Sequence, residues 1–319
     1  MLCSIRFIEL TLQLGTEDFE RHLDRRLHKS EEMYQTDFGW VDEAHVKRGV
    51  GVAFYDSPKK KKIKLIVYCP GLVIDPNDPD ELWEPTHGNV SKLVDKLDKM
   101  IVKYLSSDYG LHDFDLARVD IAADLNVGRE RVADYIKVLH NIRQVKCFSP
   151  MKYGRRDGKT KQKCFGLIGN SNNVDFFVHG LEYDKKTLRA EVRLMKNSTI
   201  RDYTDETDTA EQLRVLAEKR EAIFMDTFQH IVPRGDFYKK PKAEKLVRER
   251  VTDWKLRSRM LRLLTLIPEK KSLHLALKAM SYRKLREVLI AFAEIDVSPV
   301  TISKRHDRKE LPSLYRYMD

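Results

Sequence analysis

Two segments of the chain alternate charged and apolar residues as a β-strand with one buried face does. In residues 117–125, the charged side chains that share one face are Arg118, Asp120 and Asp124. The opposite face carries the apolar residues Val119, Ile121, Ala123 and Leu125. Residues 188–194 repeat the pattern, and their charged face carries Arg189, Glu191 and Arg193.

Three carboxylates would share one sheet face if these two strands were neighbours. Carboxylate oxygens at close range are ligands that Mg²⁺ and Mn²⁺ prefer. A metal bound by Asp120, Asp124 and Glu191 could polarise a scissile phosphate. The alternative, and the more common arrangement, is an exposed face on which arginines and carboxylates form ion pairs, each worth under about 1 kcal/mol.

The basic residues of the chain are concentrated at its C-terminal end. Residues 232–319 hold 22 Lys and Arg against 11 Asp and Glu, a net charge of +11, whereas the preceding 231 residues have a net charge of −1. A local excess of cations is typical of a protein that binds a polyanion such as DNA. A solvated helical surface rich in lysine is the alternative.

Several classes of protein do not fit the sequence. The start of the chain carries Arg6 and Glu9 within its apolar stretch and lacks a cleavage site for a signal peptide, so we expect a first β-strand and a cytoplasmic protein. No apolar run approaches the length of a membrane span. The four cysteines are widely spaced without a C-x-x-C pair, which argues against structural zinc and disulfides.

The first two thirds of the chain predict an α+β fold, an antiparallel sheet with helices packed on one face in two ββα-like halves. Predicted strands cover residues 5–14, 51–55, 63–68, 116–125, 164–168, 174–183 and 188–195. Predicted helices cover residues 19–27, 90–105 and 129–142.

Helical spacing dominates the rest of the chain. We predict helices at 209–231, 243–267, 272–279 and 282–292, a linker at 233–241 and a break at Pro268. The pattern therefore predicts two domains, an α+β domain at 1–231 and a basic helical DNA-binding domain at 232–319 that is compatible with a helix-turn-helix or winged helix.

Short motifs resemble rolling-circle replication initiators, namely the gene-II-type proteins of filamentous phages and related plasmid and transposon proteins. Arg118 to Ile121 with Asp124 resembles their R-[VI]-D-[IV] strand. Further blocks follow in the same order. Residues 167–172 are similar to the family's Y-[IF]-G-x-x-S segment and residues 183–185 to its Y-D-K segment. Residues 188–194 are similar to its L-R-x-E-[VL]-R-L segment and residues 294–297 to its G-I-D-I segment. The best matches fall between residues 115 and 200.

The resemblance implies a site-specific, relaxase-like single-strand endonuclease that depends on Mg²⁺ or Mn²⁺. In such families a tyrosine attacks a DNA phosphate, leaves a 3′-hydroxyl as primer and keeps the 5′-phosphate covalently bound. It also implies a replication origin as the partner, in single- and double-stranded form, with a host helicase or polymerase as a further partner, and a homodimer is one option for assembly.

The chain departs from the family pattern where the nucleophile is expected. Leu167 stands at the position of the family tyrosine before I-G. Either another tyrosine attacks, for which we consider Tyr183, Tyr153 and Tyr203, or the protein is a DNA-binding initiator or regulator that does not cut. Tyr183 is the preferred catalytic candidate because it is nearest in sequence to the second charged strand; its alternative is a tyrosine that merely closes a strand.

Three groups of basic residues are candidate DNA contacts. The strands contribute Arg118, Arg189 and Arg193, and a basic loop contributes Lys152, Arg155 and Arg156, which could hold a single strand. The C-terminal region contributes Lys255, Arg257, Arg259 and Arg262, expected to follow duplex phosphates. His179 is a lone strand histidine and is expected to be structural, and the strands lack the exposed aromatic pair of an RNA-binding sheet.

Overall fold

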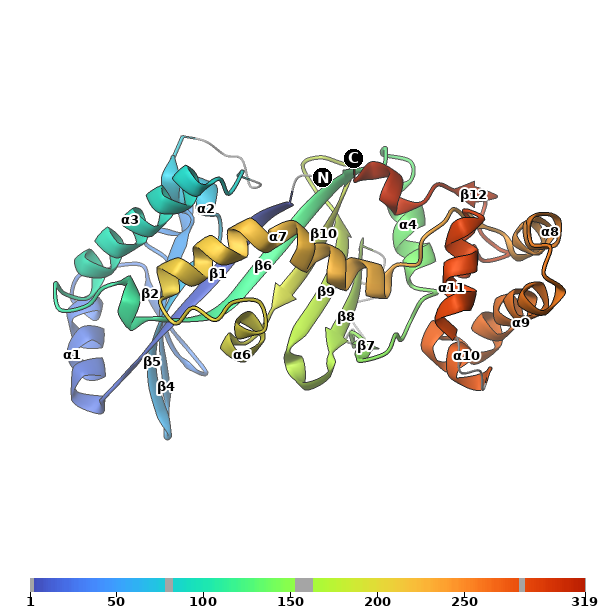
Figure 1. Ribbon diagram of the computed structural model, residues 1–319. Coiled ribbons are helices and arrows are strands. Elements are labelled where there is room, and N and C mark those ends of the chain that lie inside the picture. Colours follow the sequence, from blue (N-terminus) through green and yellow to red (C-terminus); the bar gives the residue numbers. More distant parts are fainter. Residues whose placement is uncertain (1–2, 78–82, 153–162, 281–284, 319) are drawn as a thin grey trace. The chain divides into compact units, whose positions relative to one another are not determined.

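The computed structural model describes residues 3–77, 83–152, 163–280 and 285–318 and has an α+β fold (Figure 1). Its main sheet is antiparallel and has ten strands among these residues, in the order β2-β3-β4-β5-β1-β6-β10-β9-β8-β7. These strands are β1 (Cys3–Leu14), β2 (Met33–Thr36), β3 (Gly39–Asp42), β4 (Val50–Ser57), β5 (Lys60–Val67), β6 (Asp115–Asn126), β7 (Phe148–Pro150), β8 (Cys164–Gly169), β9 (Val174–Gly180) and β10 (Thr187–Leu194).

Helices join the strands and form most of the C-terminal region. The α-helices before residue 232 are α1 (Thr16–Leu27), α2 (Pro70–Ile74), α3 (His87–Tyr104), α4 (Val132–Leu139), α6 (Asn197–Arg201) and α7 (Thr209–Ile231). Those after it are α8 (Lys240–Arg250), α9 (Trp254–Lys270), α10 (Leu273–Ala279) and α11 (Leu285–Glu294). The predicted fold class, an antiparallel sheet with helices and a helical C-terminal region, is confirmed.

Contacts divide the chain into two compact units. The first unit holds residues 123–192 and 225–319, and the second holds 2–122 and 193–224. β6, β10 and α7 therefore each contribute residues to both units. The boundary between residues 231 and 232 that the charge distribution predicts is a different division of the chain, and it stays a prediction.

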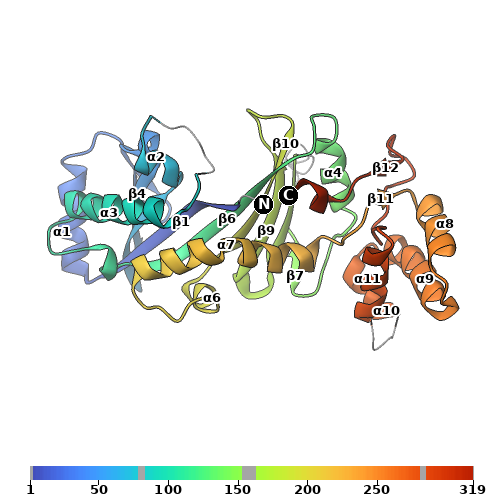
Figure 2. The ribbon, with the colours of Figure 1, turned by 45° about the horizontal axis from the view of Figure 1, so that its top comes forward.

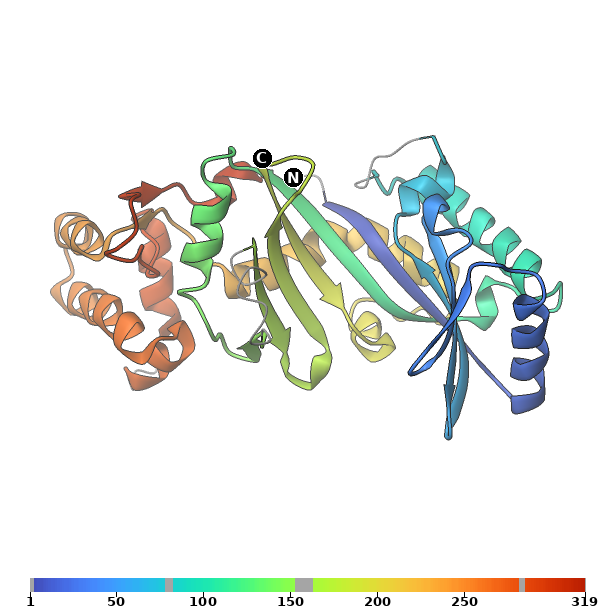
Figure 3. The same ribbon diagram turned by 180° about the vertical axis from the view of Figure 1, so that it is seen from behind.

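In the second unit, helices cover the apolar side of the first strands (Figure 3). Phe19 of α1 lies edge to face with Phe54 of β4, with 5.9 Å between ring centroids. The register of β4 with β5 pairs Phe54 with Ile63, and both are buried. α7 is fixed to β1 by a hydrogen bond of 2.8 Å from Arg220 Nε to the carbonyl of Cys3.

In the first unit, aromatic rings join β8 and β9 to two helices. Phe176 of β9 meets Phe165 of β8 and Phe228 of α7 edge to face, at 6.4 and 5.9 Å between centroids. Phe165 also meets His140, which ends α4, at 5.6 Å. α4 and the end of α7 therefore cover the same apolar face of these strands, as the alternation predicts.

The C-terminal helices pack on one another within the first unit (Figure 2). The predicted single helix at 243–267 is wrong, because Val251 adopts extended backbone and ends α8, and Asp253 caps a new helix, α9. The predicted break at Pro268 is also wrong. Proline occupies the last turn of α9, where it removes one helical hydrogen bond, and the helix ends only at Lys270. The predicted linker contains β11 (Phe237–Tyr238), which pairs with β12 (Glu310–Leu311).

Candidate functional site

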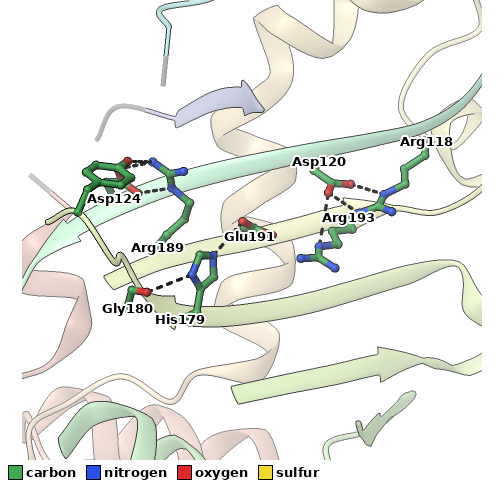
Figure 4. A network of polar contacts seen from close by, with 9 residues as sticks. Arg118, Asp120, Asp124, His179, Gly180, Arg189, Glu191 and Arg193 are labelled. Carbon is green, nitrogen blue, oxygen red and sulfur yellow. Dashed lines mark hydrogen bonds and ion pairs between the residues drawn. The ribbon is translucent and has the colours of Figure 1, made fainter. Parts of the chain in front are cut away.

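The charged residues predicted from the sequence form two clusters, each within one unit (Figure 4). The Tyr183 cluster lies in the first unit and comprises two hydrogen-bonded groups, one of Asp124, Arg189 and Tyr183 and the other of His179 and Glu191. Arg189 and Glu191 lie two positions apart on β10. The Asp120 cluster lies in the second unit and consists of Arg118, Asp120 and Arg193. The intervening apolar residues are buried as predicted, namely Val119, Ile121, Ala123, Ala190 and Val192. Asp120, Arg189 and Glu191 are buried as well, so both faces of these strands are covered here, whereas the alternation predicts one buried face.

Arg189 is the most buried member of the Tyr183 cluster, with 1% of its surface exposed. Its Nε donates to Asp124 Oδ1 at 2.8 Å and its Nη2 donates to Asp124 Oδ2 at 2.9 Å. Burial of a guanidinium is costly unless such a partner compensates its charge. Nη2 also donates to the hydroxyl of Tyr183 at 3.1 Å, so the guanidinium connects the carboxylate with the phenol.

Tyr183 lies in the turn between β9 and β10 and is 67% exposed. Asp184 stabilises this turn by accepting hydrogen bonds from Thr187 Oγ1 at 2.6 Å and from the backbone N–H of Lys186 at 3.1 Å. These two hydrogen bonds lower the pKa of the Asp184 carboxyl. The turn therefore presents an exposed phenol ring whose hydroxyl oxygen contacts a buried cation.

His179 and Glu191 form the second pair of this cluster. His179 Nε2 lies 3.1 Å from Glu191 Oε1, and Nδ1 lies 3.4 Å from the carbonyl of Gly180. Glu191 is buried, whereas 29% of the His179 side chain is exposed. Both ring nitrogens of His179 therefore face acceptor oxygens.

The Asp120 cluster is a compact ion-paired group. Arg118 donates to both carboxylate oxygens of Asp120, at 2.7 Å from Nε and 2.5 Å from Nη2. Arg193 Nε lies 3.4 Å from Asp120 Oδ2. The Arg118 guanidinium also lies 4.4 Å from the centre of the Phe7 ring, at cation–π distance.

The predicted metal site can be tested against these contacts. Mg²⁺ needs several oxygen ligands in near-octahedral geometry. Among the described residues, no group of three or more His, Cys, Asp or Glu side chains lies close enough to hold a metal ion. The residues present therefore do not fit a resident metal as arranged, and the chemistry of the site is argued from the tyrosine and the arginine.

Leu167, which stands where the family tyrosine is expected, belongs to the core. It is fully buried in β8 and pairs with Phe176 of β9. Gly169, two positions later, has no room for a side chain, because a Cβ there would lie 2.1 Å from the carbonyl oxygen of Val174. A side chain at position 167 points into the protein, so this motif has a packing role in this chain.

The other candidate tyrosines differ from Tyr183. Tyr203 follows α6 in the second unit and is half-buried. Tyr153 lies outside the described residues, together with Arg155 and Arg156 of the basic loop. Lys152, at the edge of the described part of this loop, is exposed.

Three of the four basic residues predicted on α9 share one side of the helix. Lys255, Arg259 and Arg262 are spaced i, i+4 and i+7. Arg257 lies away from this stripe, and its Nη1 donates to the carbonyl of Val251 at 3.4 Å. Trp254 at the start of the helix is 66% exposed, with Lys255 Nζ 5.8 Å from its ring centre.

Sequence reasoning expected His179 to be structural and did not identify its partner, Glu191. The signal that would find this contact is the pairing of β9 with β10, which places His179 beside Glu191. Register between two strands is set by tertiary packing and turn geometry, so a single sequence does not specify it.

Comparisons with known protein families, characterised proteins and solved structures gave no match. None of the described helices is both long and apolar enough to cross a membrane.

Proposed function

We propose that this protein is a rolling-circle replication initiator that nicks and rejoins one DNA strand through Tyr183. The observation that carries the proposal is the exposed side chain of Tyr183, whose hydroxyl accepts a hydrogen bond from the buried guanidinium of Arg189. The motif resemblance and the net charge of +11 over residues 232–319 support DNA as the substrate.

The proposed reaction exchanges one phosphoester for another. The Tyr183 hydroxyl transfers its proton to solvent, its oxygen attacks a backbone phosphorus, and the bond from phosphorus to the 3′-oxygen breaks. The departing 3′-oxygen takes up a proton and becomes a hydroxyl that can prime synthesis, while the 5′-phosphate stays on the tyrosine. The reverse reaction rejoins the strand without an external energy source.

Arg189 is suited to assist this step. A fixed cation beside the attacking oxygen stabilises the negative charge that develops there. Asp124 holds the guanidinium through two hydrogen bonds, so little reorganisation is needed when the substrate arrives. In this account Asp124 is a positioning residue.

A second candidate function is favoured by a separate observation. Asp120, Asp124 and Glu191 each have a basic partner, and this is the arrangement expected of a sheet face with a structural role. The corresponding protein would be a DNA-binding initiator or regulator without nuclease activity.

A nicking assay separates the two functions. Supercoiled DNA that carries the protein's own locus is incubated with the full chain and Mg²⁺, Mn²⁺ or EDTA, and relaxed circles with protein bound to the 5′ end are measured after denaturation. We expect Tyr183→Phe to abolish both products and Tyr203→Phe, a matched control, to keep them. Relaxation of the DNA by Tyr183→Phe would show that Tyr183 is not the nucleophile. If the parent protein relaxes no DNA under any of these conditions, only the DNA-binding function would be supported.

The same assay tests the metal. If nicking requires Mg²⁺ or Mn²⁺ as the sequence predicts, it should be lost in EDTA. It should also be lost in Asp120→Ala and in Glu191→Ala. Undiminished nicking in EDTA would remove the metal from the account and leave the tyrosine.

A further inference from the structure

A pocket in the first unit is lined by residues of the C-terminal region and of the turn after α4, and Tyr183 is not among them. It has a volume of about 620 Å³, in the range of ligand sites. Its walls come from four places, namely the turn after α4, the start of α8, the end of α9 and residues 301–305.

The walls of this pocket are strongly basic. Five cationic side chains line it, namely Arg143, Lys240, Lys271, Lys304 and Arg305. Among the described residues, the acidic residue in the lining is Glu269. Lys240 has a carboxylate partner, Glu244, at 3.7 Å. No Asp or Glu in the described part of the chain forms an ion pair with the other four. By contrast, Arg308 and Arg316 of the same unit each pair with two carboxylates.

The backbone of the pocket gives an independent observation. Arg143 and Lys271 have φ angles of 54° and 51°, in the left-handed region that residues other than glycine and asparagine seldom adopt. Hydrogen bonds tie their two turns together, from the N–H of Leu273 to the carbonyl of Ile142 at 3.1 Å and from the N–H of His274 to that of Gln144 at 3.1 Å. Two unfavourable conformations are thus maintained at two cations that line one pocket and have no carboxylate partner among the described residues, which is a pattern found at functional sites.

The lining indicates the chemistry of the ligand. Arginine and lysine that have no carboxylate partner in the described part of the chain, together with the hydroxyls of Thr265 and Ser303, are groups that bind phosphate oxygens. No aromatic ring is found among the described residues that line the pocket, so a base has nothing to stack on. Cations spread over four chain segments suit successive phosphates of a backbone better than a single nucleotide.

We propose that this pocket binds phosphate groups of a DNA backbone. The proposal rests on the proposed function for the identity of DNA as substrate, but it does not depend on cleavage. The C-terminal end of α9 lines the pocket, and the same helix carries the stripe of Lys255, Arg259 and Arg262. One helix therefore connects the two basic surfaces.

Binding is measured with the full chain carrying Tyr183→Phe, so that cutting cannot affect the result. The probes are a labelled duplex of 30 base pairs and a single strand of 30 nucleotides, both of mixed sequence, in fluorescence anisotropy between 50 and 200 mM KCl. Arg143→Asn/Lys271→Asn removes two charges and keeps a residue type that accepts left-handed backbone. Lys304→Gln/Arg305→Gln removes the other two in a segment without positive φ.

Each double variant is expected to weaken duplex binding about tenfold at 100 mM KCl and to lower the slope of log K against log salt by about 2, because each lost phosphate contact removes about 0.9. The matched control is Lys59→Gln/Lys60→Gln in the exposed β4–β5 turn of the other unit, which should change affinity less than twofold. Thermal unfolding of each variant checks that the fold is kept.

Two results would overturn the proposal. The first is duplex affinity within twofold of the parent in both double variants, with an unchanged salt slope. The second is displacement of the DNA by micromolar ATP or inorganic phosphate, which would assign the pocket to a small phosphate ligand. Because the assay contains no cleavage step, a protein that binds in this way but never nicks would keep the pocket and discard only the nicking function.

Discussion

Arg189 is the residue on which the candidate site depends, since one buried guanidinium contacts both Asp124 and Tyr183. Its charge must stay compensated in the folded protein, because an uncompensated buried charge is strongly destabilising. The same contact that stabilises the fold thus places a cation at the tyrosine hydroxyl. Stability and chemistry at this site should therefore respond differently to changes in its two partners.

Asp124→Ala should lower the free energy of unfolding by about 3 kcal/mol, because it removes the carboxylate that accepts two hydrogen bonds from the buried Arg189 guanidinium. Urea unfolding measures the change. Arg21→Ala is a matched control, since it breaks an exposed ion pair with Asp18 and should cost under about 1 kcal/mol. Equal costs for the two variants would show that the buried pair has no special weight.

His22 should make the stability of the second unit depend on pH. Its side chain is buried, and neither ring nitrogen has a hydrogen-bond partner among the described residues. Burial, together with the nearby charges of Arg21 and Arg25, lowers its pKa below the usual 6.5. The unfolded chain therefore binds the proton more readily, and stability is lost as the pH falls below about 6.5.

The test of this pH dependence is the unfolding free energy between pH 5 and pH 8. The slope below about pH 6.5 should be smaller in His22→Leu, whereas His112→Leu, which removes an exposed histidine, should keep it. A parent protein whose stability is flat over this range would contradict the assignment.

At the level of single residues, alternation predicted which side chains share a face but not their partners. Asp120 and Asp124 emerge on β6 as expected, yet each binds an arginine, and Glu191 binds a histidine that the sequence did not single out. Which side chains become ion-pair partners depends on strand register, which the sequence does not specify. The burial of Leu167 could not be predicted for the same reason. Its burial depends on the pairing of β8 with β9, which the motif alone does not reveal.

Elements were predictable where their own periodicity is strong. α7 begins and ends at the predicted residues, 209 and 231, and the strands β1, β6 and β10 match closely. Short elements such as β2 and β3 were missed, because four residues contain too little pattern. The division of residues 243–267 into α8 and α9 was missed because apolar spacing continues across the break, and only the cap at Asp253 marks it.

α9 allows a prediction with a control in the same helix. Replacing Lys255, Arg259 and Arg262 by alanine should weaken duplex binding and lower its salt slope by up to about 3, if each contacts one phosphate. Arg257→Ala should leave the slope unchanged, because Arg257 lies off the stripe. Anisotropy titrations of both variants at several salt concentrations give the two slopes. Equal changes of slope in the triple variant and in Arg257→Ala would show that the stripe is not the DNA contact surface.

Over the whole molecule, charge and chemistry are distributed unevenly. The two charged clusters of the sheet are internally paired, whereas the pocket of the C-terminal region keeps four cations without carboxylate partners among the described residues. Composition predicted the basic C-terminal region and the fold class, since both follow from residue counts and periodicity. It could not predict the two compact units, because residues 123–192 join 225–319 through contacts distant in sequence.

The proposed reaction attaches Tyr183 covalently to the 5′ end of the cut strand. The direct measurement is mass spectrometry of tryptic peptides after reaction with DNA of the protein's own locus and nuclease digestion of the bound strand. We expect a nucleotide attached through a phosphate to Tyr183, and no adduct in Tyr183→Phe. An adduct on any other tyrosine, or none while the DNA is nicked, would contradict it.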